Sequence, residues 1–107
     1  MKRVMVRYTV KAGRAAENER YIEQVFAELA RLAPAGVQYS AFKQDDGVTF
    51  VHVYSHEGDD AAGLLPTLPA FQAFRGGLNE RCEVAPVRTA LHQVGSYMSL
   101  SGSEARL

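Results

Sequence analysis

The segment RVMVRYTVKAGRAAENERYIEQVFAELARL, Arg3–Leu32, contains the change of pattern that decides the fold. Its first part, Arg3–Lys11, alternates apolar and polar side chains, which is the two-residue period of a half-buried strand. After Gly13, apolar residues recur at spacings of three and four, which predicts an amphipathic helix over Ala15–Leu32. A strand that leads directly into a helix is the first half of a β-α-β unit.

Four further elements continue this order. They are two strands, a helix and a final strand, at Gly36–Lys43, Val48–Ser55, Thr67–Arg81 and Pro86–Tyr97. Asp45-Asp46-Gly47 between the second and third strands supplies the residues that tight hairpin turns require. The order β-α-β-β-α-β with right-handed crossovers predicts an α+β, ferredoxin-like fold, a four-stranded antiparallel sheet with two helices on one face.

The second helix carries its own start signal and one irregularity. Thr67 is expected to cap it, and Pro69 stands in the first turn, where a missing N–H costs nothing. Gly76-Gly77 inside the helix should cost about 2 kcal/mol relative to alanine. Either the backbone packs closely on a neighbour at this point, or the helix is distorted.

Composition bounds the class of protein. The 107 residues suit one domain, expected over residues 1–98, with a flexible tail over 99–107. Twelve basic and twelve acidic residues give no net charge, so neither nucleic acid nor an anionic membrane is an expected partner. No apolar run reaches the roughly 20 residues of a membrane span, and the single cysteine, Cys82, excludes an internal disulfide. We expect a cytoplasmic protein.

Alternation divides the strands between two faces. In the first strand one face carries Val4, Val6, Tyr8 and Val10, which we expect the helices to cover. In the third strand we assign Val51 and Val53 to the same covered face. The open face would then carry six residues of mixed character: Met5, Arg7, Thr9, Phe50, His52 and Tyr54. Such a surface is too apolar to stay bare and too polar for a core, which predicts a homodimer pairing sheet to sheet around a cavity.

His52 is the candidate catalytic residue of that cavity. Its near-neutral pKa suits a general base that takes a proton from a phenol or enol. The alternative is a histidine that a neighbouring side chain satisfies within an interface. Arg7 could neutralise a ligand anion or form an ion pair across the dimer. The other candidate ligand-binding residues are Tyr54, Phe50, Thr9 and Met5. His56 shares the face of His52, but two such residues lie about 13 Å apart along a strand, so no metal site is expected.

Three segments resemble a known superfamily. MKRVMVRYTVKAGR at Met1–Arg14 resembles the opening of dimeric α/β-barrel proteins of the antibiotic-biosynthesis-monooxygenase type. LPAFQAFRGGLNERC at Leu68–Cys82 is similar to their second helix, and VGSY at Val94–Tyr97 to their final strand. The resemblance implies a ferredoxin-like dimer that binds a small aromatic or enolic molecule and uses no cofactor. Cofactor-independent oxygenation or isomerisation is the implied chemistry, and a non-catalytic binding or stress-response module is the alternative.

Two residues that catalytic members of this superfamily use have no counterpart in this sequence, which limits the activities that the resemblance implies. Relatives that oxygenate polyketide quinols use tryptophan, and this chain has none. Relatives that degrade haem hold iron through a histidine on the second helix, and Thr67–Arg81 contains none. The segment Gly47–Val53 also faintly resembles the RNA-recognition motif. Val48 and Val53 stand where that motif has aromatic residues and Asp46 where it has a basic one, which argues against RNA binding.

Overall fold

The computed structural model describes residues 1–58 and 63–99. The elements run in the predicted order: β1 Lys2–Val10, α1 Ala15–Leu32, β2 Val37–Lys43, β3 Thr49–His56, η1 Leu65–Thr67, α3 Pro69–Gly76, α4 Leu78–Arg81 and β4 Cys82–Leu91. Helix α1 has the predicted bounds, and the first three strands lie within one residue of theirs. Most of the expected tail, residues 100–107, lies outside the described residues.

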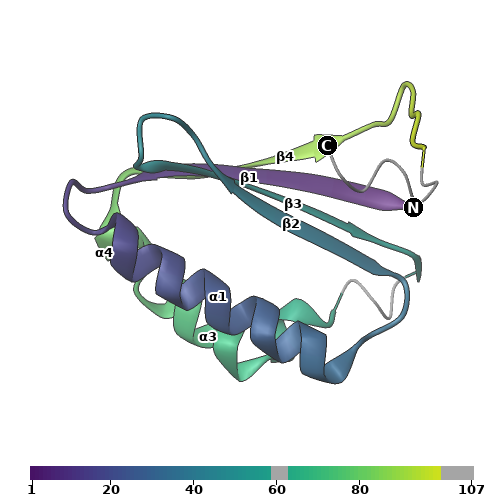
Figure 1. Cartoon of the computed structure of the whole chain (residues 1–107), viewed down its shortest axis with the longest axis horizontal. Helices are drawn as coiled ribbons and strands as arrows, with labels where there is room; N and C mark the ends of the chain where they lie inside the picture. The colour runs from purple at the N-terminus through teal and green to yellow at the C-terminus, as the bar shows by residue number, and fades with distance from the viewer. Residues whose placement is uncertain (59–62, 100–107) are drawn as a thin grey trace.

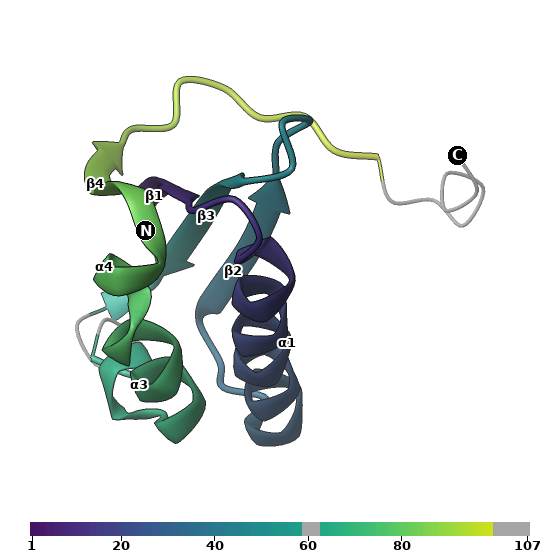
Figure 2. The same cartoon turned by 90° about the vertical axis from the view of Figure 1, so that its left-hand side faces the viewer.

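The strands form one antiparallel sheet in the order β2-β3-β1-β4. Figure 1 shows α1, α3 and α4 together below the sheet, and Figure 2 shows α1 and α3 side by side on that face. None of the helices in the described part of the chain lies over the opposite face. This is the predicted ferredoxin-like α+β fold.

Local chemistry sets the ends of the first half of the chain. Ala33 adopts a left-handed conformation with φ of 47° after α1, and its N–H donates to the carbonyl of Leu29. The β2–β3 turn has Gly47 at φ of 79°, and the Asp46 carboxylate accepts from the N–H groups of Val48 and Thr49. The turn predicted at Asp45-Asp46-Gly47 is therefore confirmed.

The second helical stretch is broken rather than continuous. Helix α3 begins at Pro69, later than predicted. Its N-cap is Leu68, and the Thr67 hydroxyl instead donates to the carbonyl of Leu64. The helix ends at Gly76, and α4 resumes one residue later. Both explanations of the glycine pair apply, because the chain is distorted here and a Cβ on Gly77 would lie 3.2 Å from the Arg81 guanidinium.

The predicted bounds of the last strand, Pro86–Tyr97, are wrong. Strand β4 begins at Cys82, which pairs with Val10, and it ends at Leu91, so VGSY lies beyond it. The error follows from reading Pro86 as a strand start. Strand β4 is an edge strand, and its register with β1 shifts where Arg7 pairs with Val87 but Thr9 with Val84. A proline is tolerated at such a bulge on an edge.

The predicted phase of β3 is also wrong. Tyr8 pairs with Phe50, Val6 with His52 and Val4 with Tyr54, and directly opposed residues share a face. Phe50, His52 and Tyr54 therefore lie beneath the helices, while Val51 and Val53 lie on the open face. The sequence pattern did not distinguish the two phases, because β3 is apolar or aromatic at nearly every position.

The core lies between the sheet and the helices. Tyr8, Val10 and Phe50 from the sheet pack with Val25 of α1 and Phe74 of α3. The rings of Tyr8 and Phe50 stack with centroids 5.6 Å apart. The part of β1 predicted to be covered is thus confirmed as core, and it positions the polar groups described next.

Candidate functional site

A buried histidine stands at the centre of this helix–sheet layer. His52 of β3 is 5% exposed, and both ring nitrogens have partners. Its Nε2 lies 2.9 Å from the Tyr8 hydroxyl on β1, and its Nδ1 lies 2.7 Å from the Tyr39 hydroxyl on β2. Because β3 is the strand between β1 and β2, a tyrosine can reach the imidazole from each side.

The hydrogen bonds continue from Tyr8 to the helices. The Asn18 Nδ2 of α1 donates to the Tyr8 hydroxyl at 2.8 Å. The Arg81 Nε, at the end of α4, donates to Asn18 Oδ1 at 3.2 Å. We call Arg81, Asn18, Tyr8, His52 and Tyr39 the polar chain, since each bonds the next. It joins five elements across the interior.

Burial sets the protonation states within the polar chain. Loss of solvent lowers the pKa of His52 to about 4, so the imidazole is neutral at neutral pH. Burial also raises the pKa of Tyr8, against a smaller lowering from the Asn18 hydrogen bond. Burial, and then the neighbouring tyrosines, raise the pKa of Tyr39. Both phenols therefore keep their protons, and Arg81 is the charged member.

Arg81 is an unusual buried cation. Only 1% of its surface is exposed, and in the described part of the chain no carboxylate lies within ion-pair distance. Its Nη2 donates to the Phe74 carbonyl at 2.8 Å. The guanidinium carbon lies 4.4 Å from the centre of the Tyr21 ring and 5.6 Å from that of Phe74. Carbonyl, amide and aromatic partners thus compensate its lost hydration.

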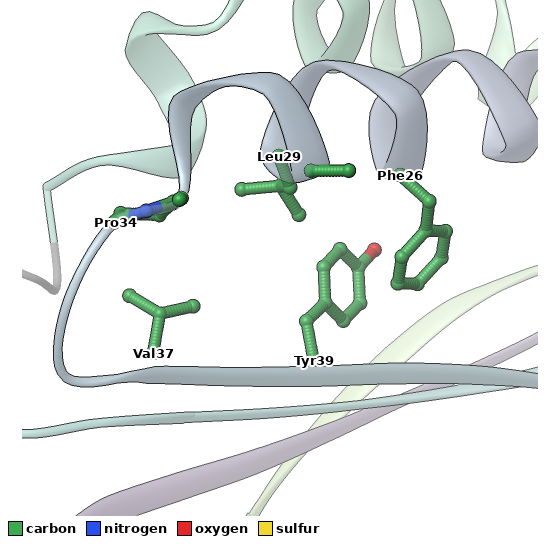
Figure 3. A pocket seen from close by; sticks show the side chains of 7 residues that line it. Phe26, Leu29, Pro34, Val37 and Tyr39 are labelled. Atoms are coloured by element: carbon green, nitrogen blue, oxygen red, sulfur yellow. The ribbon is translucent and has the colours of Figure 1, made fainter.

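An open groove reaches the other end of the polar chain. It has a volume of about 320 Å³ and lies between the end of α1 and β2. Six of its lining residues are apolar, and the seventh is Tyr39: Phe26, Leu29, Ala30, Ala33, Pro34, Val37 and Tyr39. In Figure 3, Tyr39 rises from β2 with its hydroxyl on the side of α1, near Leu29 and Phe26. Among these side chains only that of Tyr39 carries a polar atom.

The predicted site residues do not come together. Met5, Arg7 and Thr9 lie on the open face as expected, whereas His52 faces the helices with Phe50 and Tyr54. The predicted convergence of Arg7 and His52 is therefore wrong, because the sheet separates them. None of the six predicted residues lines the groove. A second hollow of about 220 Å³ lies on the open face, between residues that include Arg3, Phe42 and Val53.

Four members of the polar chain were not predicted as site residues, although Tyr8 was expected on the covered face. Asn18 gave a possible signal, because it is a polar residue placed near the apolar stripe of α1, and it is fully buried. Tyr39 follows Val37 by two residues on β2 and therefore shares its face, which was compatible with a position beneath the helices. Arg81 gave none, since an arginine at a helix end usually lies in solvent.

Neither a cluster of metal ligands nor a membrane-spanning helix is found among the described residues. Within residues 1–58 and 63–99, no three His, Cys, Asp or Glu side chains come together as metal ligands would. His56 Nδ1 instead lies 2.9 Å from the Gly58 carbonyl oxygen. None of the helices in these ranges has the length and apolar character needed to cross a membrane. His92, which the predicted bounds of the last strand included, lies exposed beyond β4.

Solved structures with the same architecture connect the fold to known proteins. A protein described as an antibiotic biosynthesis monooxygenase superposes with a TM-score of 0.73 at 14% identity, covering 89% of this chain and 100% of that one. Rv0793 from Mycobacterium tuberculosis has a TM-score of 0.74 at 14% identity, covering 91% and 98%. SnoaB from Streptomyces nogalater, a cofactor-independent oxygenase solved as a point mutant, has a TM-score of 0.67 at 19% identity, covering 89% and 94%.

These likenesses confirm the fold that the sequence resemblance implied. The chain has the ferredoxin-like fold of the antibiotic-biosynthesis-monooxygenase-type proteins, over nearly the full length of both partners. At such low identity the likeness concerns the fold alone. No family model matches the sequence, and no curated protein matches it either.

Proposed function

We propose that this protein binds a small aromatic or enolic molecule in the groove beside α1, with the ligand's oxygen on the Tyr39 hydroxyl. The observation that carries the proposal is that Tyr39, connected through His52 to the polar chain, has the only polar side-chain atom among the residues that line the groove. Small-molecule sites are typically lined by apolar side chains with a few placed polar groups. The volume, about 320 Å³, suits a ligand of one or two rings.

The same geometry offers a second function, cofactor-independent oxygenation of that ligand. Support comes from Tyr39, whose proton can stabilise an enolate oxygen, and from the fold shared with a cofactor-independent oxygenase. In such a reaction the substrate supplies all the electrons. A CH₂ group and O₂ become a carbonyl and water, after a proton leaves the carbon. His52 lies behind Tyr39 and would act on the ligand only through it, which favours binding over the direct proton abstraction expected from the sequence.

The open face supports a homodimer in this proposal. Phe42 of β2 is 58% exposed and Val87 of β4 is 60% exposed, with Val53 between them in the sheet order. Beyond β4 the chain leaves on the side away from the helices, with Tyr97 90% exposed. Two copies paired through this face would bury these apolar groups and enclose Arg7, Thr9 and Met5 between the sheets.

Blocking the groove tests the binding function. Ala30 is exposed and lines the groove, so Ala30→Trp should fill it without disturbing the core. We expect 1-naphthol, followed by its fluorescence in a titration, to lose at least about tenfold in affinity. Ala27→Trp, one turn earlier on an exposed position outside the groove, is the matched control and should bind normally.

The outcomes separate the candidate functions. Equal binding by both tryptophan variants, or no binding by the unchanged protein in a thermal-shift screen of hydroxy-aromatics, would contradict a ligand site in this groove. Uptake of O₂ on an oxygen electrode with a bound hydroxy-aromatic, lost in Tyr39→Phe, would establish the oxygenase. Ligand binding with neither O₂ uptake nor an isomerised product would support a non-catalytic binding module.

A further inference from the structure

The Arg81 end of the polar chain can donate hydrogen bonds but cannot accept them. A guanidinium group donates hydrogen bonds and cannot accept them. Arg81 Nε therefore requires an oxygen at the Asn18 position that it contacts at 3.2 Å. With its oxygen turned to Arg81, the Asn18 amide presents its NH₂ group to the Tyr8 hydroxyl at 2.8 Å. The direction of the first two bonds thus follows from the charge at the end.

The same donor-to-acceptor order determines which ring nitrogen of His52 carries the proton. The Tyr8 oxygen accepts from Asn18, so the single Tyr8 proton is available for His52 Nε2 at 2.9 Å. A neutral imidazole carries one N–H, which must then be on Nδ1. That N–H donates to the Tyr39 oxygen at 2.7 Å. Tyr39 accepts this bond, and its own proton is the last in the series.

We infer that Arg81 and Asn18 are positioning residues that hold His52 as the Nδ1–H tautomer and leave Tyr39 as a hydrogen-bond donor for a ligand in the groove. The groove would then select ligands that present an acceptor oxygen, such as a ketone or an enolate. A ligand that can only donate would be rejected.

The packing around Arg81 makes this arrangement rigid. Asn18 is 0% exposed, and water therefore does not compete for its amide. A Cβ on residue 77 would come within 3.2 Å of Arg81 Nη1, so glycine leaves room for the guanidinium there. All buried polar side-chain atoms in the described residues have hydrogen-bond partners.

The histidine tautomer can be observed directly. Spectra of the full chain labelled with ¹⁵N-histidine distinguish a protonated from an unprotonated ring nitrogen at neutral pH. In the unchanged protein we expect the proton of His52 on Nδ1. A proton on Nε2 would overturn the inference, whatever any variant does.

Asn18→Asp should reverse the whole series. The new carboxylate can only accept, so Tyr8 would donate to it and accept from His52 Nε2–H. Nδ1 would then accept the Tyr39 proton, and the tautomer would switch. Asn79→Asp makes the same change at an exposed position on α4 and should leave the tautomer unchanged. A folded Asn18→Asp variant with His52 still protonated on Nδ1 would contradict the role of Asn18.

The predicted selectivity for acceptor ligands rests on the proposed function, whereas the predicted tautomer of His52 does not. We expect Asn18→Asp to weaken binding of 1-tetralone, an acceptor only, by about tenfold. Binding of 1-naphthol, which can also donate, should change little. If the tautomer switches but both probes lose affinity equally, the predicted ligand selectivity is wrong. If the unchanged protein binds neither probe, the proposed function is wrong, whereas the inference about the tautomer is unaffected.

Discussion

The two faces of the sheet come from the same four strands, yet they are completed in different ways. Beneath the helices, Tyr8, His52 and Tyr39 are packed and hydrogen-bonded to one another. On the other face, Phe42 and Val87 are more than half exposed. The covered face has its polar groups satisfied within one chain, whereas the open face has its apolar groups unsatisfied by that chain.

This difference shows where aromatic residues with polar tips belong in such a sheet. A tyrosine or histidine can be buried at low cost only where its polar atoms find partners. The helices supply those partners here through Asn18 and Arg81. The open face instead exposes side chains without polar atoms, such as Phe42 and Val87, beside the polar side chain of Arg7.

Substitutions at two adjacent residues of β1 should give the largest difference in stability between the two faces of the sheet. Tyr8→Ala should lower the free energy of unfolding by about 3 to 5 kcal/mol, because it empties the centre of the core and breaks two hydrogen bonds. Arg7→Ala, next in sequence but on the open face, should change it by about 0.5 kcal/mol or less. Urea denaturation of both variants measures the contrast. Similar losses would mean that the faces are assigned wrongly.

Lowering the pH probes the covered face without a mutation. The pKa of His52 is about 4 in the folded chain, against 6.5 unfolded, so protons bind the unfolded state first. Stability should be fully present above pH 6.5 and fall by about 3 kcal/mol as the pH drops to 4. The carboxyls of Glu17 and Asp46 have lowered pKa values and titrate below this window, so pH 6.5 to 5 reports mainly His52.

His52→Gln serves as the control for this pH dependence. Glutamine keeps an amide that can bond a tyrosine but does not titrate. Its unfolding free energy should therefore vary much less between pH 6.5 and 5, even if it is lower throughout. A variant curve parallel to that of the unchanged protein would show that His52 is not the group responsible.

Strong periodicity made most of the fold predictable from the sequence. Helix α1, the Asp46 turn and the order of elements each had a local chemical signal. The phase of β3 had none, because a strand apolar on both faces leaves the choice to its partner, and only pairing with Tyr8 settles it. The predicted site depended on that phase, so His52 was identified as notable but placed on the wrong face.

The remaining members of the site depend on contacts distant in sequence. Arg81 and Asn18 are 63 residues apart, and nothing in either local pattern indicates their bond. The edge position of β4, which permits Pro86 inside a strand, is likewise a property of the whole sheet. Such features require the tertiary structure.

A charge on the open face tests whether that face awaits a second copy. Phe42→Glu places one carboxylate per protomer in the proposed sheet-to-sheet interface, where it would lose solvent without a partner. The dimer should weaken by about 2 kcal/mol, roughly 30-fold in dissociation constant, as measured by sedimentation equilibrium. Circular dichroism should remain unchanged, because Phe42 is exposed in the single chain.

Ala73→Glu provides the matched comparison for this variant. Ala73 is exposed on α3, on the side of the molecule that carries the helices, so the same added charge should leave association unchanged. An unchanged protein that sediments as a monomer would contradict the homodimer. Equal weakening by both variants would show that net charge, rather than the open face, controls association, and the apolar groups on that face would need another explanation.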